Sequence, residues 1–155
     1  MIIELGKVSE DGSQYTGEDS ESILGLAEEK RVRVVSPIRY DLFVEKVGTE
    51  LLVRGTVEVD MEIECGRCAD FFSTTVSDSS FLRAYEISEK TEAVDVTPDI
   101  REDILLDMPA YPLCSQECKG LCPNCGTNLN KEQCACKVAV KEEDRWAELN
   151  RLKLS

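Results

Sequence analysis

The stretch that decides the fold is residues 53–68, VRGTVEVDMEIECGRC. Apolar side chains occupy odd positions of this stretch, at Val53, Val57, Val59, Met61, Ile63 and Cys65. The even positions from Arg54 to Glu64 are polar or charged, and most are acidic. A period of two predicts a strand with one buried face and one wet, acidic face. The strand ends at two cysteines separated by two residues.

The flanking residues extend this β pattern in both directions. Upstream, apolar residues alternate between 32 and 44, and Gly48 with Thr49 predicts a turn. Downstream, the apolar residues of 71–85 predict a second strand. We therefore expect an antiparallel hairpin with the Cys65–Cys68 motif at its tip. Residues 1–6 predict a short strand, 10–21 a polar loop, and 86–96 an exposed connection with room for a short strand.

Three segments carry helix signals. Thr97 and Pro98 predict the start of a helix near 98–108, and Pro109 ends it. A second, short helix is expected from Ser20 or Ser22 to Lys30. A third, amphipathic helix is expected over 141–154.

These elements predict an α+β fold. We expect a mainly antiparallel β body, either a sheet or a partial barrel, with two or three helices and a C-terminal cysteine-rich, zinc-ribbon-like module. The predicted division places the acidic β body in 1–113, and the zinc module with the C-terminal helix, packed on the body, in 114–155.

The eight cysteines form four close pairs: Cys65/Cys68, Cys114/Cys118, Cys122/Cys125 and Cys134/Cys136. Structural zinc is bound by four soft ligands in a tetrahedron, so four pairs predict two structural Zn²⁺ ions with all eight thiolates as ligands. Iron–sulfur clusters, redox-active thiols and disulfides are the alternatives. The spacing matches neither common ferredoxin run, and a thioredoxin-type motif requires a parallel βαβ context.

Two arrangements of the pairs remain open. In the first, Cys122/Cys125 and Cys134/Cys136 form one site within 15 residues, while Cys65/Cys68 meets Cys114/Cys118. In the second, Cys114/Cys118 joins Cys122/Cys125, and Cys65/Cys68 joins Cys134/Cys136. We favour the first, because its long-range site closes a long loop, where a cross-link constrains the unfolded chain most.

The composition of the chain limits the compartment and the classes of function that we expect. The chain of 155 residues has a net charge of −13 and no histidine, which removes the commonest general base, and we expect no enzyme. No signal peptide or membrane-spanning run is evident, so we expect a cytoplasmic protein in which thiols stay reduced. Residues 1–113 carry 11 basic against 25 acidic residues, a balance of −14, and the remainder +1. Any RNA contact must therefore be local, through the C-terminal part or a patch such as Lys30, Arg31 and Arg33.

Several of these motifs together resemble the YceD family of large ribosomal RNA subunit accumulation proteins. They are the Cys65-Gly66-Arg67-Cys68 motif, the helix running into Leu106-Asp107-Met108-Pro109, and the segments Pro112-Leu113-Cys114, 118–126 (CKGLCPNCG), 128–130 (NLN), 134–136 (CAC) and 144–149 (DRWAEL). The resemblance covers roughly residues 31–155.

The resemblance implies a non-enzymatic factor that supports large-subunit ribosomal RNA accumulation and ribosome assembly in a bacterium or plastid. The implied partner is large-subunit ribosomal RNA, or a basic large-subunit ribosomal protein or assembly factor. Neither a membrane nor a small-molecule substrate is expected. The alternative function is a thiol redox or zinc-handling protein that uses exposed, exchangeable pairs such as Cys65/Cys68 or Cys134/Cys136.

Overall fold

A five-stranded antiparallel sheet forms the body of the protein in the computed structural model, which describes residues 1–136. Its strands are β2 (Ser13–Asp19), β3 (Val32–Val34), β4 (Ile38–Val47), β5 (Glu50–Glu64) and β6 (Phe71–Glu86). Strand order is β2-β4-β5-β6, and β3 pairs with β5 beyond the end of β4. The order is that of an open sheet, with β2, β6 and the short β3 at its edges.

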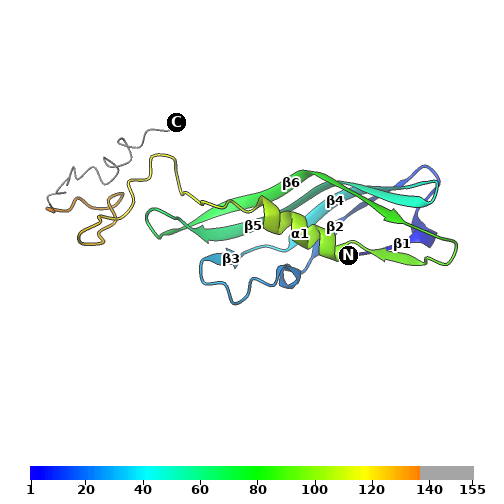
Figure 1. Ribbon diagram of the computed structural model, residues 1–155, viewed down its shortest axis with the longest axis horizontal. Coiled ribbons are helices and arrows are strands. Elements are labelled where there is room, and N and C mark those ends of the chain that lie inside the picture. Colours follow the sequence, from blue (N-terminus) through cyan, green and yellow to red (C-terminus); the bar gives the residue numbers. More distant parts are fainter. Residues whose placement is uncertain (137–155) are drawn as a thin grey trace, which may run out of the picture.

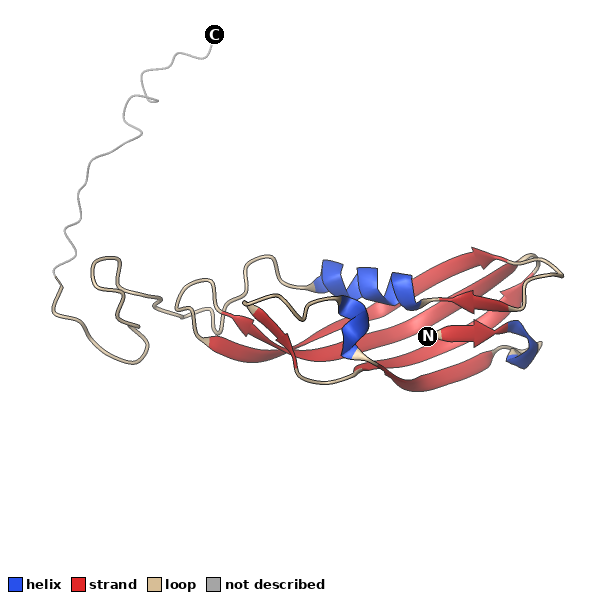
Figure 2. Ribbon diagram, turned by 90° about the horizontal axis from the view of Figure 1, so that it is seen from below, coloured by secondary structure: helices blue, strands red, loops and turns tan. Residues whose placement is uncertain are grey.

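A smaller layer covers one face of this sheet. Helix α1 (Thr97–Asp107) contacts β5 and β6, and β1 (Ile2–Glu4) pairs with β7 (Ala93–Asp95) in a separate two-stranded sheet. Two short 3₁₀ helices, η1 (Leu5–Lys7) and η2 (Glu21–Leu24), complete the elements. The cysteine-rich segment continues past the tip of the β5–β6 hairpin, at one end of an elongated molecule (Figures 1 and 2). Among residues 1–136, no helix has the length and apolar character needed to cross a membrane.

The core lies between the sheet and the helix, and it confirms the alternation predicted for residues 53–64. Val53, Val57, Val59 and Met61 are fully buried, and the residues between them are exposed or half-buried. The helix contributes Ile100 and Ile104, β4 contributes Leu42, and β6 contributes Phe81, all of them buried.

A bulge interrupts the long hairpin at Gly55, where the register between β5 and β6 shifts. The backbone φ of Gly55 is +154°, and a Cβ atom added there would lie 2.1 Å from the carbonyl oxygen of Asp41 in β4. Only glycine permits this approach of two strands.

The prediction of a loop over 10–21 is wrong, because residues 13–19 form β2. This strand pairs with β4 from Ser13↔Val44 to Asp19↔Ile38. Its side chains alternate between half-buried and exposed, but most are polar, so the sequence shows no apolar period. The backbone ladder and the close approach of Gly17 to the Tyr40 ring hold this edge strand in place.

The helix predictions are correct for one segment and wrong for another. The helix expected near 98–108 is α1, although its N-cap is Val96 and Thr97 is its first residue. The helix expected from Ser20 to Lys30 is only the 3₁₀ turn η2, whose first turn Ser20 caps. Gly25, with φ +68°, adopts the left-handed conformation and ends it.

The expected count of two or three helices is therefore not matched, since residues 1–136 contain one α-helix. The helix expected over 141–154 lies outside the described residues.

Candidate metal centres

The structure gathers the eight cysteines into two groups of four. Cluster 1 consists of Cys65, Cys68, Cys114 and Cys118, and cluster 2 of Cys122, Cys125, Cys134 and Cys136. Within each cluster all four sulfur atoms lie within 4.8 Å of one another. This is the first of the two arrangements considered from the sequence, and either cluster could hold a metal ion.

The hairpin tip positions the first half of cluster 1. Cys65 follows directly on β5, and the turn that reverses the chain is closed by hydrogen bonds from Cys65 N to Asp70 O and from Ala69 N to Cys65 O, both 2.9 Å long. Ala69 adopts the left-handed conformation, with φ +57°. Both thiols point inward as a result, and Cys65 is 1% and Cys68 3% exposed.

The second half of cluster 1 arrives from the segment after α1. Gly66 N donates to Pro112 O at 2.8 Å, which places Cys114 beside the hairpin tip. Cluster 1 therefore joins the segment predicted as the β body to the segment predicted as the zinc module.

The sulfur atoms of cluster 1 are close but not bonded. Cys65 Sγ lies 3.8 Å from Cys118 Sγ, and Cys68 Sγ lies 3.8 Å from Cys114 Sγ. A disulfide requires about 2.05 Å. None of the eight cysteines forms a disulfide.

The surroundings of cluster 1 favour thiolate at some sulfurs and disfavour it at others. Burial opposes ionisation of Cys65, but backbone N–H groups of Cys114, Cys68 and Arg67 donate to its sulfur and lower its pKa to about 6. The neighbouring sulfur of Cys118, together with burial, raises the pKa of Cys114 to about 12.

Cluster 2 is built on a second tight turn. Cys122 N donates to Thr127 O at 2.8 Å, and Gly126 N, at a φ of +74°, donates to Cys122 O at 2.9 Å. The side chain and backbone of Thr127 lower the pKa of Cys125 to about 6. The Cys125 sulfur, together with burial, raises the pKa of Cys136 to about 12.

The same electrostatic pattern thus recurs in both clusters. A thiolate at one position makes ionisation of its neighbour unfavourable, because like charges at this separation repel. Four thiolates can coexist in so small a volume only around a cation. The donor set is entirely sulfur, which suits a soft or borderline metal ion.

Polar residues outside the cysteine pairs tie the two clusters together. Asn130 Nδ2 donates to Cys118 Sγ at 3.3 Å, so a residue from the loop of cluster 2 supports a sulfur of cluster 1. Asn128 Nδ2 and Lys131 Nζ both donate to Asp70, at 2.7 Å and 2.9 Å. Sequence reasoning did not identify Asp70, Asn130 or Lys131 as functional, and the signal for Asn128 and Asn130 was their place in the family-like segment 128–130.

The acidic face of β5 is partly neutralised within the sheet. Arg39 bonds to Glu58 at 2.8 Å and to Asp60 at 3.0 Å. Hydrogen bonds from Arg39 and then Thr75 hold the pKa of Asp60 below its usual value. Arg33 lies 3.6 Å from Glu62, with its guanidinium 4.0 Å from the centre of the Phe71 ring. The face is therefore wet, as predicted, but less negative than the sequence of β5 alone indicates.

The antiparallel sheet, with a hairpin tip that supplies half of a four-cysteine cluster, places the protein in the class of β proteins with cysteine-rich extensions that could hold metal ions. Comparison with known proteins gives the family. Residues 82–153 match the family described as Large ribosomal RNA subunit accumulation protein YceD. The YceD resemblance inferred from the sequence is confirmed, and the matched segment contains α1 and six of the eight cysteines.

Relatives with similar sequences extend the comparison. An uncharacterized protein of Mycobacterium leprae is 33% identical over 108 residues, which are 61% of this chain and 50% of the relative. One of Mycobacterium tuberculosis is 33% identical over 123 residues, which are 70% of this chain and 58% of the relative. The matched part thus spans between half and three fifths of these relatives.

A named plant relative aligns over a shorter stretch. It is the Large ribosomal RNA subunit accumulation protein YCED homolog 1, chloroplastic, of Arabidopsis thaliana, 36% identical over 54 residues, which are 35% of this chain and 17% of the relative. No solved structure matches the chain.

Proposed function

We propose that this protein is a non-enzymatic factor that supports accumulation of large-subunit ribosomal RNA, and with it assembly of the large ribosomal subunit, in the cytoplasm. The observation that carries the proposal is the match of residues 82–153 to the YceD family. That segment includes α1, the chain from 108 to 113 and the second half of cluster 1. The segment that matches the family is therefore the one that contains six of the eight cysteines.

The metal in both clusters is, in this proposal, a structural Zn²⁺. A tetrahedron of sulfur atoms at about 2.3 Å from a central zinc has edges of about 3.8 Å. The two sulfur–sulfur contacts of cluster 1 are 3.8 Å long. Four thiolates fill the coordination sphere and leave no position for a substrate, so zinc acts here as a cross-link.

The proposed partner is large-subunit ribosomal RNA or a basic large-subunit ribosomal protein or assembly factor. The charge balance of −14 over residues 1–113 suits contact with a basic protein along the body. Contact with RNA requires a local surface that carries positive charge.

The alternative of a thiol redox or zinc-handling protein has one supporting feature. In cluster 2, Cys125 is exposed and Cys134 and Cys136 are half-buried, so metal exchange there is sterically easier than in cluster 1. The expectation that Cys65 and Cys68 are exposed is wrong, because both are buried at the hairpin tip. Retention of two zinc ions per chain against a moderate chelator, with no thiol titrated in the native protein, excludes this alternative.

The test of the proposed function is depletion in the cells that produce the protein. Large-subunit ribosomal RNA, measured relative to small-subunit ribosomal RNA, should fall on depletion and recover when the intact chain is supplied. A variant with Cys65→Ser and Cys68→Ser should restore it poorly, whereas the exposed Arg101→Gln variant should restore it fully. Unchanged ribosomal RNA after depletion contradicts the proposal.

A further inference from the structure

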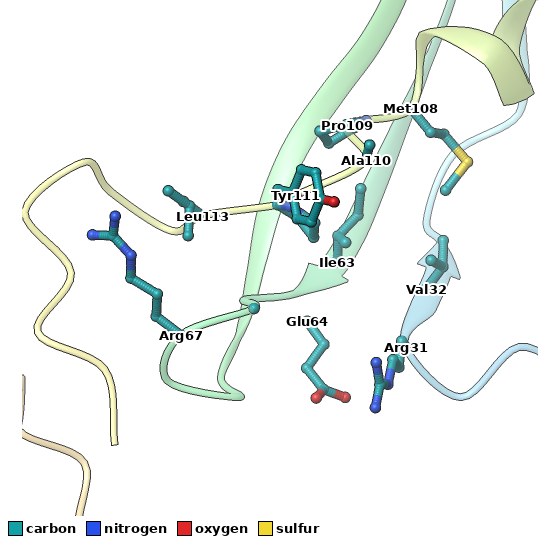
Figure 3. A pocket seen from close by; sticks show the side chains of 12 residues that line it. Arg31, Val32, Ile63, Glu64, Arg67, Met108, Pro109, Ala110, Tyr111 and Leu113 are labelled. Carbon is teal, nitrogen blue, oxygen red and sulfur yellow. The ribbon is translucent and has the colours of Figure 1, made fainter. Parts of the chain in front are cut away.

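A groove lies beside cluster 1, between the end of β5, the start of β3 and residues 108–113, which we call the strap. It encloses about 610 Å³. Figure 3 shows the strap along one side and Val32, with Arg31, on the other. The strap is held at one end by α1 and at the other by the hydrogen bond from Gly66 N to Pro112 O.

The lining combines an apolar interior with a positive rim. Val32, Ile63, Met108 and Leu113 supply the apolar surface. The charged residues of the groove are two arginines, Arg31 and Arg67, and one acid, Glu64. On a body with a balance of −14 over residues 1–113, this rim is a local reversal of sign that suits an anionic ligand.

Tyr111 gives the groove an unusual exposed aromatic surface. Its side chain is 89% exposed, the highest fraction among the large apolar residues of residues 1–136. Figure 3 shows Arg31 and Arg67 on opposite sides of the ring, with the Arg67 side chain directed away from it. Pro109 and Pro112 flank it closely in the chain and restrict the backbone that carries it. An exposed aromatic ring between cations is the combination that binds unpaired bases and their phosphates.

We propose that this groove binds single-stranded RNA, with Tyr111 stacking on a base and Arg31 and Arg67 contacting phosphates. The inference rests on the proposed function and specifies direct contact with ribosomal RNA as the means. A basic peptide would meet two arginines in the groove, so charge favours RNA over that partner. Double-stranded RNA keeps its bases paired and offers none to Tyr111.

Arg67 and Arg31 differ in how they are held. Arg67 Nη1 donates to the carbonyl oxygens of Gln116 and Cys118, at 3.0 and 3.1 Å, so the side chain is fixed at the rim and also supports cluster 1. Arg31 is exposed and precedes β3. Substitution of Arg31 therefore tests the phosphate contact without disturbing cluster 1. Substitution of Arg67 would also remove its hydrogen bonds to Gln116 and Cys118, and so would disturb the cluster.

The experiment measures binding of the zinc-loaded full chain to a fluorescein-labelled oligouridylate of about 12 nucleotides by fluorescence anisotropy. Tyr111→Ala should weaken binding by about 5- to 150-fold, because stacking on the ring is lost, whereas Tyr111→Phe should bind as the parent does. Arg31→Gln should lower the slope of log affinity against log salt by about 0.7, the contribution of one phosphate on a single strand. Arg101→Gln, an exposed arginine on α1, is the matched control and should leave both quantities unchanged.

Each of three results with RNA overturns the inference: no binding of the oligouridylate, equal binding of a duplex of the same length, or binding that Tyr111→Ala and Arg31→Gln leave unchanged. Binding of a lysine-rich peptide that Tyr111→Ala abolishes would assign the groove to a protein partner instead. Failure of the proposed function is seen separately, in the depletion experiment. If depletion lowers ribosomal RNA and the Tyr111→Ala chain restores it fully, the groove inference fails and the proposed function stands.

Discussion

Loss of cluster 1 should destabilise the protein more than loss of cluster 2, by an amount that follows from loop length. Cys68 and Cys114 are 46 residues apart, and closing a loop of that length in the unfolded chain costs about 4 kcal/mol at 25 °C. Cys125 and Cys134 are nine residues apart, and the corresponding cost is about 2.5 kcal/mol.

The difference in loop-closure cost appears as a difference in stability because zinc stabilises the fold only to the extent that it binds the native state more tightly than the unfolded chain. The unfolded chain can still form cluster 2 around zinc, which reduces the effect of that ion. In cluster 1, by contrast, the longer loop is closed in the folded protein by the hairpin and by the hydrogen bond from Gly66 N to Pro112 O. With the same four-thiolate chemistry at both sites, Cys114→Ser should lower the free energy of unfolding by about 1.5 kcal/mol more than Cys134→Ser, or about 3–6 °C in Tm.

The assay combines zinc content by mass spectrometry with chemical unfolding followed by circular dichroism at a fixed concentration of free zinc. The intact chain should hold two zinc ions. Cys65→Ser and Cys114→Ser should each lose one, and the double variant should still lose only that one. A double variant that loses both ions refutes the pairing, and a Cys134→Ser variant as unstable as Cys114→Ser refutes the loop-length reasoning.

Three further predictions follow from single contacts. Gly55→Ala should lower the free energy of unfolding by at least about 2 kcal/mol in urea titrations, because its Cβ would lie 2.1 Å from the carbonyl oxygen of Asp41. The control is Gly48→Ala, at φ +63° with open space around it, which should lower the free energy of unfolding by only about 1 kcal/mol. Hydrogen bonds from Arg39, and more weakly from Thr75, hold the pKa of Asp60 below its ordinary 3.8. The ionised carboxylate therefore stabilises the fold above pH 3.8, and this contribution is lost as the pH falls below that value. In urea titrations across the acid range, the free energy of unfolding should decline less steeply for Asp60→Asn than for the parent. Asn130→Ala removes the donor to the sulfur of cluster 1 and should speed release of one zinc to a colorimetric chelator by about tenfold, with the second zinc unaffected.

The features that were predictable from the sequence are those whose signal is local. The alternation in β5 is visible in its own sequence because apolar residues are needed on the buried face and polar residues on the exposed face. The hairpin follows from two strands on either side of a close cysteine pair. The grouping of the cysteines was favoured on spacing and loop length, and the structure places the sulfurs in that grouping.

The features that were missed depend on contacts between distant residues. β2 is a polar edge strand whose stability comes from its ladder with β4, so no periodicity of its own reveals it. The groove exists because the strap crosses the hairpin tip, an approach held by the hydrogen bond from Gly66 N to Pro112 O and by the cysteines of cluster 1. The favoured pairing of Cys65/Cys68 with Cys114/Cys118 brings the strap to the hairpin tip, but nothing in the local sequence of either segment indicates the groove that results.

The strongly negative charge of the chain, taken alone, argues against RNA binding, but its distribution in space weakens that objection. At physiological ionic strength, repulsion between exposed charges falls off over about 8 Å. On β5, Glu58 and Asp60 are already paired with Arg39. The remaining repulsion acts equally on the parent and on the Arg31→Gln variant, so it cancels when their salt slopes are compared. The difference in slope therefore isolates the phosphate contact at the groove, whatever the body contributes to the absolute affinity.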